Sequence, residues 1–268
     1  MNTSESVFRS DLLDGQVAFV TGGATGIGKE ICRVLGRHGA RIAIASRKRE
    51  VLAAAAAELG AEGVEVHFDT CDVRDADAVR GVVDAIIGRY GRLDILVNNA
   101  AGNFPAPISK ISPNGFKAVV DIDLLGTFNV SKAAFEAWMA EHGGSIVNIT
   151  APFEMKGAAL QSHVAAAKAG VDSLTRTCAV EWGRHGIRVN GIAPGTIGGT
   201  EGVRRFAAVV PGSDTRPSNP LGIIGSGADI ANLVLYLSSE AARFVSGQVI
   251  AVDGAGTVDQ MKLDLSSF

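Results

Sequence analysis

Tyrosine is scarce in this sequence: Tyr90 and Tyr236 are the only two among 268 residues. Cysteine is scarce as well, and the three scattered residues Cys32, Cys71 and Cys178 cannot build a disulfide framework or a thiolate metal site. The charges nearly balance, with 25 Lys+Arg against 28 Asp+Glu, so the composition gives no footprint for nucleic acid. No apolar run approaches the roughly 18 residues of a membrane span. These absences exclude disulfide-stabilised, thiolate-metal, nucleic-acid-binding and membrane-spanning classes.

The two ends carry no recognisable targeting signal. The start, MNTSESVFRSDLLDG, lacks the charged-then-apolar pattern of a signal peptide. The last residues, DLSSF, match neither a peroxisomal nor a retention signal. With reduced cysteines, the expected location is the cytoplasm.

Short β-rich runs alternate with helical patterns along the whole chain. This alternation is typical of a parallel sheet with helices on both faces, and buried parallel strands fit the nearly continuous apolar runs. The sequence therefore predicts an α/β fold: a single Rossmann-type doubly wound parallel sheet flanked by helices, in one domain over residues 1–268. The expected strands are Val17–Thr21, Arg41–Ala45, Val64–Asp69, Asp94–Asn98, Ser145–Thr150, Arg188–Ala193 and Gln248–Val252. The expected helices are Ile27–His38, Glu50–Leu59, Ala76–Tyr90, Gly115–His142, His163–Arg184 and Ala228–Ser239.

One irregular stretch, at about residues 196–227, is rich in Gly, Pro and Ser. A loop of that length in a compact domain commonly covers a site or is disordered. We expect it to form a substrate lid.

The first expected strand runs directly into the segment Gly22-Gly23-Ala24-Thr25-Gly26-Ile27-Gly28, and a helix is expected to begin near Ile27. Glycines let backbone N–H groups approach a pyrophosphate, and a helix N-terminus adds partial positive charge. Because this turn follows a strand and opens a βαβ unit, it predicts a dinucleotide-binding site.

The second expected strand ends in Ser46, Arg47 and Lys48, without the carboxylate that would accept hydrogen bonds from the adenosine ribose of NAD. A hydroxyl and cations suit a 2′-phosphate instead, and charge-assisted bonds of this kind contribute roughly 1.5–3 kcal/mol each. The sequence therefore favours NADPH over NADH as the cofactor.

Several motifs together resemble the short-chain dehydrogenase/reductase family over nearly the full chain. They are T-G-x-x-x-G-I-G at Thr21–Gly28, Asp72-Val73, Asn98-Asn99-Ala100, Lys168, and Arg188-Val189-Asn190 leading to Pro194-Gly195. The resemblance implies that Asp72 and Val73 contact adenine, that Lys168 bonds the nicotinamide ribose, and that residues 194–200 cradle nicotinamide and pyrophosphate. The expected cofactor-binding residues are Thr21, Gly22, Gly23, Ala24, Thr25, Gly26, Ile27, Gly28, Ser46, Arg47, Lys48, Asp72, Val73, Asn99, Ala100, Lys168, Pro194, Gly195, Thr196, Ile197 and Thr200.

The family's catalytic positions are mostly changed. Its Tyr proton donor, four residues before the Lys, is Val164 here; its Ser is Ala151, and its Asn is Asp123. Neither Val nor Ala can donate a proton, and loss of a general acid costs about 10²–10⁴-fold, so ordinary ketone reduction is disfavoured. His163 adjoins the vacant Tyr position, but one residue along a helix is a rotation of about 100°, so its side chain is expected to point elsewhere.

The changed positions resemble the 2,4-dienoyl-CoA reductase branch of the family, in particular its peroxisomal type. The strings AAGNF at 100–104, QSHVAAAK at 161–168 and GTEGVRR at 199–205 carry this resemblance. The mitochondrial type has a Tyr fifteen residues before the Lys, where this chain has Phe153. In that chemistry hydride from NADPH adds to the far end of a conjugated dienoyl thioester and a proton is delivered to carbon, leaving a 3-enoyl thioester. No alkoxide forms, so no acid is needed at the Tyr position.

The resemblance implies Asp123 and Lys168 as the catalytic residues. A water held by Asp123 is favoured over direct donation, and a purely structural role for Asp123 is the alternative. Arg47 can serve either the cofactor phosphate or CoA. The expected substrate-binding residues are Arg47, Arg74, Phe104, Ser112, Pro113, Asn114, Phe153, Val164 and Arg205.

Three functions stay open. The first is an NADPH-dependent reductase of an unsaturated acyl-CoA, with an enoyl thioester reductase as a close variant. The second is a carbonyl or 3-oxoacyl-CoA reductase with His163 or Asp123 as its acid, and the third is a catalytically silent NADPH-binding protein. The resemblance further implies a homo-oligomer, commonly a tetramer, with no metal, nucleic-acid or membrane partner.

Overall fold

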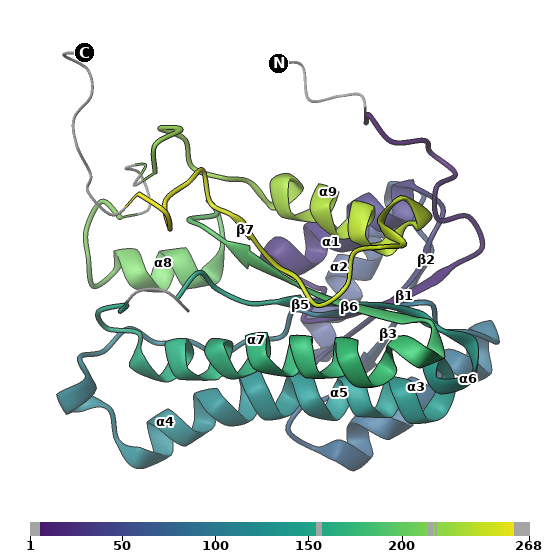
Figure 1. Cartoon of the computed structure of the whole chain (residues 1–268), viewed down its shortest axis with the longest axis horizontal. Coiled ribbons are helices and arrows are strands. Elements are labelled where there is room, and N and C mark those ends of the chain that lie inside the picture. The colour runs from purple at the N-terminus through teal and green to yellow at the C-terminus, as the bar shows by residue number, and fades with distance from the viewer. Residues whose placement is uncertain (1–5, 154–156, 214–216, 218, 260–268) are drawn as a thin grey trace.

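The computed structural model describes residues 6–153, 157–213, 217 and 219–259. Over this part of the chain, seven parallel strands form one sheet in the order β3-β2-β1-β4-β5-β6-β7 (Figure 1). The strands are β1 (Val17–Thr21), β2 (Arg41–Ser46), β3 (Val66–Thr70), β4 (Ile95–Asn98), β5 (Gly144–Ile149), β6 (Ile187–Pro194) and β7 (Val249–Val252). The predicted fold is confirmed. The strand order reverses between β1 and β4, so their carboxyl ends flank the crevice where such sheets bind ligands.

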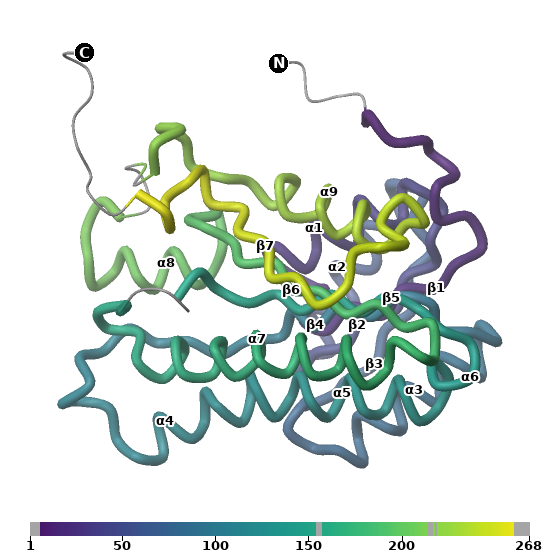
Figure 2. The backbone as a smooth tube through the Cα atoms, in the orientation of Figure 1, coloured from purple at the N-terminus to yellow at the C-terminus, as the bar shows by residue number. Residues whose placement is uncertain are grey.

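Helices cover both faces of the sheet, as Figures 1 and 2 show. One layer contains α1 (Gly26–Arg37), α2 (Arg49–Ala61) and α9 (Gly227–Ser238). The opposite layer contains α3 (Ala76–Tyr90), α4 (Pro113–Val120), α5 (Gly126–Ala134), α6 (Ala140–His142) and α7 (Ser162–Trp182). Within the described ranges, no helix is both long enough and apolar enough to cross a membrane.

The alternation of side chains along each strand divides the core between these two layers. Ala18 and Val20 of β1 pack in one buried cluster, and Val17 and Phe19 pack in the other. Successive side chains of a strand point to opposite faces, so a strand covered on both sides must be apolar throughout. The continuous apolar strand sequences follow from this double burial.

Local signals set the helix ends near the site. Ser112 caps α4, where its Oγ accepts a hydrogen bond from the N–H of Gly115 at 3.1 Å, and Pro113 occupies the first turn. Asp75 caps α3 in the same way and accepts from the N–H groups of Asp77 and Ala78. These caps satisfy backbone donors that the first helical turn leaves without partners.

A single helix was expected over Gly115–His142. The structure has a helical run from Pro113 to His142 in which two segments are π-helical and the rest is α-helical. These segments cover Asp121–Leu125 and Phe135–Met139. A π segment adds a residue to the turn, which changes the direction of the side chains that follow and often marks a functional site. Asp123 lies inside the first segment.

The expected lid is more ordered than the sequence indicates. It contains a helix, α8 (Glu201–Ala207), where Thr200 caps the first turn and Glu201 pairs with Arg204 and Arg205. Ion pairs between residues three and four apart stabilise a short helix. The sequence of α8 has no apolar periodicity, so this helix was not expected. A parallel bridge between Ile197 and Gly225 closes the base of this stretch. Residues 214–216 and 218 of the expected lid lie outside the described residues.

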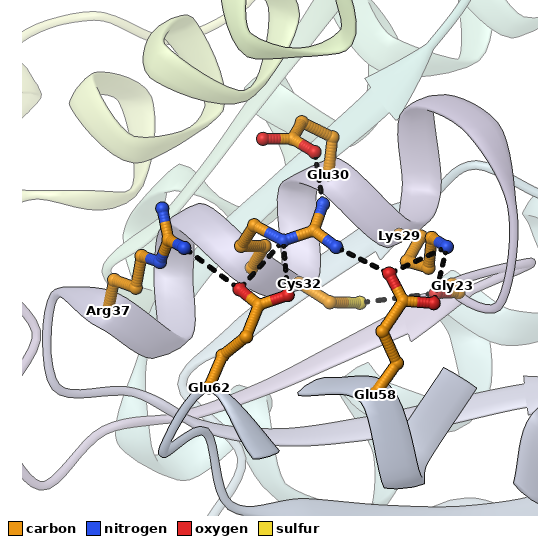
Figure 3. Close-up of polar contacts among 8 residues, drawn as sticks. Gly23, Lys29, Glu30, Cys32, Arg37, Glu58 and Glu62 are labelled. Atoms are coloured by element: carbon orange, nitrogen blue, oxygen red, sulfur yellow. Dashed lines mark hydrogen bonds and ion pairs between the residues drawn. The ribbon is translucent and has the colours of Figure 1, made fainter. Parts of the chain in front are cut away.

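A charged network ties α2 to α1, beside the glycine turn (Figure 3). Arg33 of α1 bonds Glu58 of α2 at 2.8 Å and Glu62, the residue that caps the end of α2, at 2.9 Å. It also pairs with Glu30 of its own helix. On the buried side of the same helix, Cys32 Sγ lies 3.6 Å from the Gly23 carbonyl oxygen. The helix that opens the nucleotide site is therefore fixed on both of its sides.

Candidate active site

The glycine turn packs tightly against the end of β4. A Cβ atom on Gly28 would lie 2.4 Å from Asn99 Nδ2 and 2.5 Å from the Gly22 carbonyl oxygen. Gly22 itself has a φ of +65°, which side chains disfavour. Thr21 Oγ1 accepts hydrogen bonds at 3.0 Å from the N–H groups of both Asn99 and Ala100, which joins β1 to the segment after β4. Only glycine fits this close approach, and the backbone is left open toward the crevice.

The structure brings many of the predicted cofactor residues to one crevice. Those that line it are Gly22, Thr25, Gly26, Ile27, Ser46, Arg47, Asp72, Val73, Asn99, Ala100 and Thr200. The other predicted cofactor residues, Thr21, Gly23, Ala24, Gly28, Lys48, Lys168, Pro194, Gly195, Thr196 and Ile197, lie outside this lining. Sequence reasoning missed Ala45, Cys71, Ala101, Ile122, Glu201 and Gly202, which also line it. Of these, Ala101, Glu201 and Gly202 fall inside strings that carried the family resemblance.

The end of β2 places Ser46 and Arg47 at the rim of the crevice, with the Arg47 side chain exposed. Arg74, by contrast, is engaged by Asp72: its Nε lies 2.9 Å from Oδ1 and its Nη2 lies 2.6 Å from Oδ2. The hydrogen bonds from Arg74 hold the pKa of Asp72 below its ordinary value. Asp72 therefore stays ionised at the rim, and Arg47 is the better placed of the two arginines for a phosphate.

Asp123 and Lys168 form a buried ion pair. Asp123 Oδ2 lies 3.6 Å from Lys168 Nζ, and the two residues are 0% and 6% exposed. The other carboxylate oxygen, Oδ1, accepts a 2.6 Å hydrogen bond from the N–H of Gly102. Burial raises the pKa of Asp123 above its ordinary value, against the opposing effects of Lys168 and the Gly102 N–H. The carboxyl group is thus suited to hold a proton at a higher pH than a free aspartate does.

The surrounding backbone and polar side chains fix this pair. Lys168 Nζ donates to the Ile149 carbonyl oxygen at 2.8 Å, and Thr150 Oγ1 donates to the Lys168 carbonyl oxygen at 3.3 Å. Beneath the pair, Asn98 Nδ2 donates to Asn148 Oδ1 at 2.8 Å, and thus joins β4 to β5. The ammonium group is therefore held in place by β5 as well as by the carboxylate. The contact of Lys168 with the Ile149 carbonyl oxygen could not be predicted from the sequence, because every residue has a backbone carbonyl.

The vacant acid positions are apolar. Val164, in the Tyr position, is buried on α7 next to His163; Ala151 and Phe153 are partly buried in the segment after β5. His163 is expected to point away from the Tyr direction, and its ring is fully buried, with its centroid 4.4 Å from that of Phe104. Because Phe104 belongs to the segment after β4, the first turn of α7 adjoins that segment.

Five of the predicted substrate residues, Phe104, Ser112, Pro113, Asn114 and Arg205, lie at or near the start of α4. A Cβ on Gly115 would lie 3.1 Å from Phe104 Cζ, so Phe104 packs against the turn that begins with Ser112, Pro113 and Asn114. Arg205 Nη1 donates to the Asn103 carbonyl oxygen at 2.8 Å, which joins α8 to the same segment. Arg205 also pairs with Glu201. Phe104, the start of α4 and α8 therefore lie close together, in the segment that follows the Gly102 N–H bonded to Asp123.

A nucleotide crevice at the reversal point of a parallel sheet, with a buried Lys beside it, defines a nicotinamide-dependent oxidoreductase. The family model described as "Enoyl-(Acyl carrier protein) reductase" matches residues 22–256. The chain belongs to the short-chain dehydrogenase/reductase family. The resemblance read from the motifs is thereby confirmed.

Among curated relatives, the chain is 48% identical over 250 residues to the peroxisomal 2,4-dienoyl-CoA reductase ((3E)-enoyl-CoA-producing) of Rattus norvegicus, covering 92% of this chain and 86% of that protein. It is 45% identical over 256 residues to the enzyme of the same name from Danio rerio, covering 95% and 85%. Both relatives are named peroxisomal, as are those of Pongo abelii and Mus musculus. These findings overturn the expected cytoplasmic location.

Two solved structures share the fold closely. An actinorhodin polyketide ketoreductase with NADPH has a TM-score of 0.86 and 32% identity, covering 90% of this chain and 97% of that one. The carveol dehydrogenase of Mycobacterium avium in complex with NAD also has a TM-score of 0.86, with 30% identity and coverage of 92% and 99%. One neighbour carries NADPH and the other NAD, so a nicotinamide dinucleotide is common to both.

Proposed function

We propose that the protein reduces 2,4-dienoyl-CoA to 3-enoyl-CoA with NADPH, without a tyrosine acid. The observation that carries the proposal is the buried Asp123–Lys168 pair beside apolar residues at the family's Tyr and Ser positions, Val164 and Ala151. The relatives named as 2,4-dienoyl-CoA reductases support the same substrate. A reaction that forms no alkoxide needs no acid at those positions.

The residues around the crevice fit a dinucleotide with a 2′-phosphate. A side chain does not fit at Gly22 or Gly28. Without side chains, the backbone N–H groups of this turn can approach a pyrophosphate. Ser46 and Arg47 lie at the end of β2 on the rim of the crevice, and this end of β2 carries no carboxylate; both facts support a 2′-phosphate there. When bound, NADPH supplies the hydride. Lys168 would hold the nicotinamide ribose, and residues 194–200 would lie beside the nicotinamide ring.

The proton reaches carbon through Asp123. Its carboxyl group, protonated more readily because burial raises its pKa, gives a proton to a water molecule as that water protonates the substrate carbon. The carboxylate then recovers a proton from solvent. Lys168 keeps the site electrically balanced while Asp123 is ionised, and its bond to the Ile149 carbonyl oxygen holds it in place. The apolar side chains of Val164 and Phe153 border the acyl chain.

CoA would enter between the start of α4 and helix α8. Helix α8 belongs to the segment at residues 196–227, which we propose as the substrate lid. Phe104, Ser112, Pro113 and Asn114 would border this entry, and Arg205 on α8 carries a guanidinium group beside it. Arginine binds phosphate in two-bonded geometry, which suits the phosphates of CoA. Arg74 can bind a CoA phosphate only if its hydrogen bonds to Asp72 break.

We also propose a homo-oligomer. Phe116, Leu125 and Phe128 are 36%, 42% and 45% exposed along the helical run from Pro113 to His142. An apolar stripe of this kind is typical of a face covered by another chain. Light scattering behind a sizing column gives the mass, and a monomer would contradict this proposal.

The test of the activity is NADPH oxidation, followed at 340 nm, with 2,4-hexadienoyl-CoA, 2-hexenoyl-CoA and 3-oxohexanoyl-CoA offered separately. We expect turnover of the dienoyl-CoA, with the product double bond located by mass spectrometry. Turnover of 3-oxohexanoyl-CoA alone would establish a carbonyl reductase instead. Tight NADPH binding without turnover of any thioester would establish a catalytically silent protein.

A further inference from the structure

His163 is a fully buried histidine with no hydrogen-bond partner among the residues that the structure describes. Its exposure is 0%, and within those residues neither Nδ1 nor Nε2 has a partner. A buried polar group left unpaired costs about 1–3 kcal/mol, so such groups in folded proteins call for an explanation. A neutral imidazole always presents one N–H donor, whichever nitrogen carries the proton.

The surroundings of this ring belong to the proposed substrate site. Phe104 packs edge-on against it, with ring centroids 4.4 Å apart and an interplanar angle of 66°. Phe104 is two residues from Gly102, whose N–H bonds Asp123 Oδ1 at 2.6 Å. Within the described residues, Asp123 Oδ2 also has no hydrogen-bond partner, although Lys168 lies near it. The imidazole therefore packs against the same segment whose backbone N–H bonds Asp123.

The reaction creates a need for a donor in this space. Hydride addition to a conjugated thioester sends negative charge to the thioester oxygen, and a buried anion without a donor is strongly disfavoured. The residues at the family's donor positions, Val164 and Ala151, cannot supply one. Lys168 Nζ donates to the Ile149 carbonyl oxygen, lies 3.6 Å from Asp123, and is assigned above to the nicotinamide ribose.

We propose that the ring N–H of His163 donates a hydrogen bond to the thioester oxygen of the acyl-CoA substrate. This inference rests on the proposed function. The bond strengthens as charge develops on the oxygen, so His163 lowers the barrier to hydride addition as well as holding the substrate. No proton is transferred: the imidazole keeps its N–H proton, and the proton for carbon still comes through Asp123.

The experiment compares two ligands that differ only at the proposed acceptor: hexanoyl-CoA and its thioether analogue S-hexyl-CoA, which has CH₂ in place of C=O. Calorimetry with NADP⁺ present gives both dissociation constants. We expect the wild type to prefer the thioester by about tenfold, the value of one good hydrogen bond. His163→Phe, which keeps the ring volume, should abolish most of this preference, and His163→Gln, which keeps an N–H donor, should retain much of it.

The ratio of the two constants separates this role from a structural one, because a general loosening of the site weakens both ligands alike. His142→Leu, at an exposed histidine that stacks on Trp138, is the matched control and should keep the wild-type ratio. A His163→Phe variant that keeps the full preference would overturn the inference, as would a wild type with no preference. His163→Leu repeats the test if the Phe variant does not fold. The ratio requires no turnover, so a failed assay with dienoyl-CoA contradicts the proposed function separately.

Discussion

Asp123 Oδ2 lies 3.6 Å from Lys168 Nζ, and the same aspartate accepts a 2.6 Å hydrogen bond from the N–H of Gly102. The carboxylate thus joins three parts of the fold: the π-helical segment after α4, the start of the segment after β4, and α7. A change at Asp123 acts on chemistry and on packing together, so tests of its role need measurements that separate the two.

Asp123→Asn and Lys168→Ala should each lose most of the activity toward dienoyl-CoA. The first removes the titrating carboxyl group, for which we expect a fall in kcat of about 10²–10⁴-fold. The second removes the ammonium group that positions the cofactor ribose, and should raise the KM for NADPH as well. Steady-state kinetics on both variants checks this. Asp121→Asn, two residues away and paired with Lys117, is the matched control; near-normal kcat in Asp123→Asn would exclude the water relay.

Stability should depend on pH through Asp123. Because burial raises the folded-state pKa of this carboxyl above its unfolded value of 3.8, the folded protein binds the proton more tightly than the unfolded chain. The stabilising contribution is therefore complete below the unfolded pKa and is lost as pH rises through the folded pKa. The measurement is the free energy of unfolding in urea, for wild type minus Asp123→Asn, from about pH 4 to pH 8. We expect the difference to fall with rising pH; a constant or rising difference would contradict the raised pKa.

Arg47→Ala should weaken NADPH selectively. The guanidinium group stands at the β2 end of the crevice, and one charge-assisted bond to a phosphate contributes roughly 1.5–3 kcal/mol. We expect the KM for NADPH to rise by about 10- to 100-fold while the KM for NADH changes little. Arg49→Ala, whose side chain stacks on Phe68, serves as the control. Equal losses for both cofactors would show that Arg47 acts on something other than the 2′-phosphate.

Gly28→Ala should abolish cofactor binding. Its Cβ would meet Asn99 Nδ2 at 2.4 Å and the Gly22 carbonyl oxygen at 2.5 Å, so the turn must move. Gly60→Ala is the control, because Gly60 lies in α2 with open space around it and should gain about 0.5–1 kcal/mol of stability. Fluorescence titration with NADPH and thermal unfolding together check the pair. Unchanged NADPH affinity in Gly28→Ala would show that the turn is less constrained than its contacts indicate.

The sheet was predictable because its strands are buried on both faces. Val17–Thr21 has the bounds predicted for it, and the end of α3 at Tyr90 follows from Gly91, whose φ of +72° ends a helix. Helix α8 was not predictable, since Glu201, Arg204 and Arg205 stabilise it through charge pairs that leave no apolar period. Likewise, the π segment at Asp121–Leu125 depends on packing that a helical sequence pattern does not encode.

Motif spacing singled out Asp123 and Lys168, but the groups that support them could not be predicted. Lys168 is held by the carbonyl of Ile149 and Asp123 by the N–H of Gly102, and backbone groups leave no residue pattern. The contact of His163 with Phe104 was not predicted either. A rotation of about 100° per residue describes one helix, yet says nothing of the segment packed against it.

The sulfur chemistry of the crevice has a consequence for exposure to oxidants. Cys71 lines the nucleotide crevice, and burial raises its pKa to about 11, as it does for Cys178. At neutral pH only about one such thiol in 10⁴ is a thiolate, the form that peroxides attack. Burial also raises the pKa of Cys32 beneath the glycine turn. Burial thus keeps the sulfur atoms in and beneath the crevice largely unreactive toward peroxides at neutral pH.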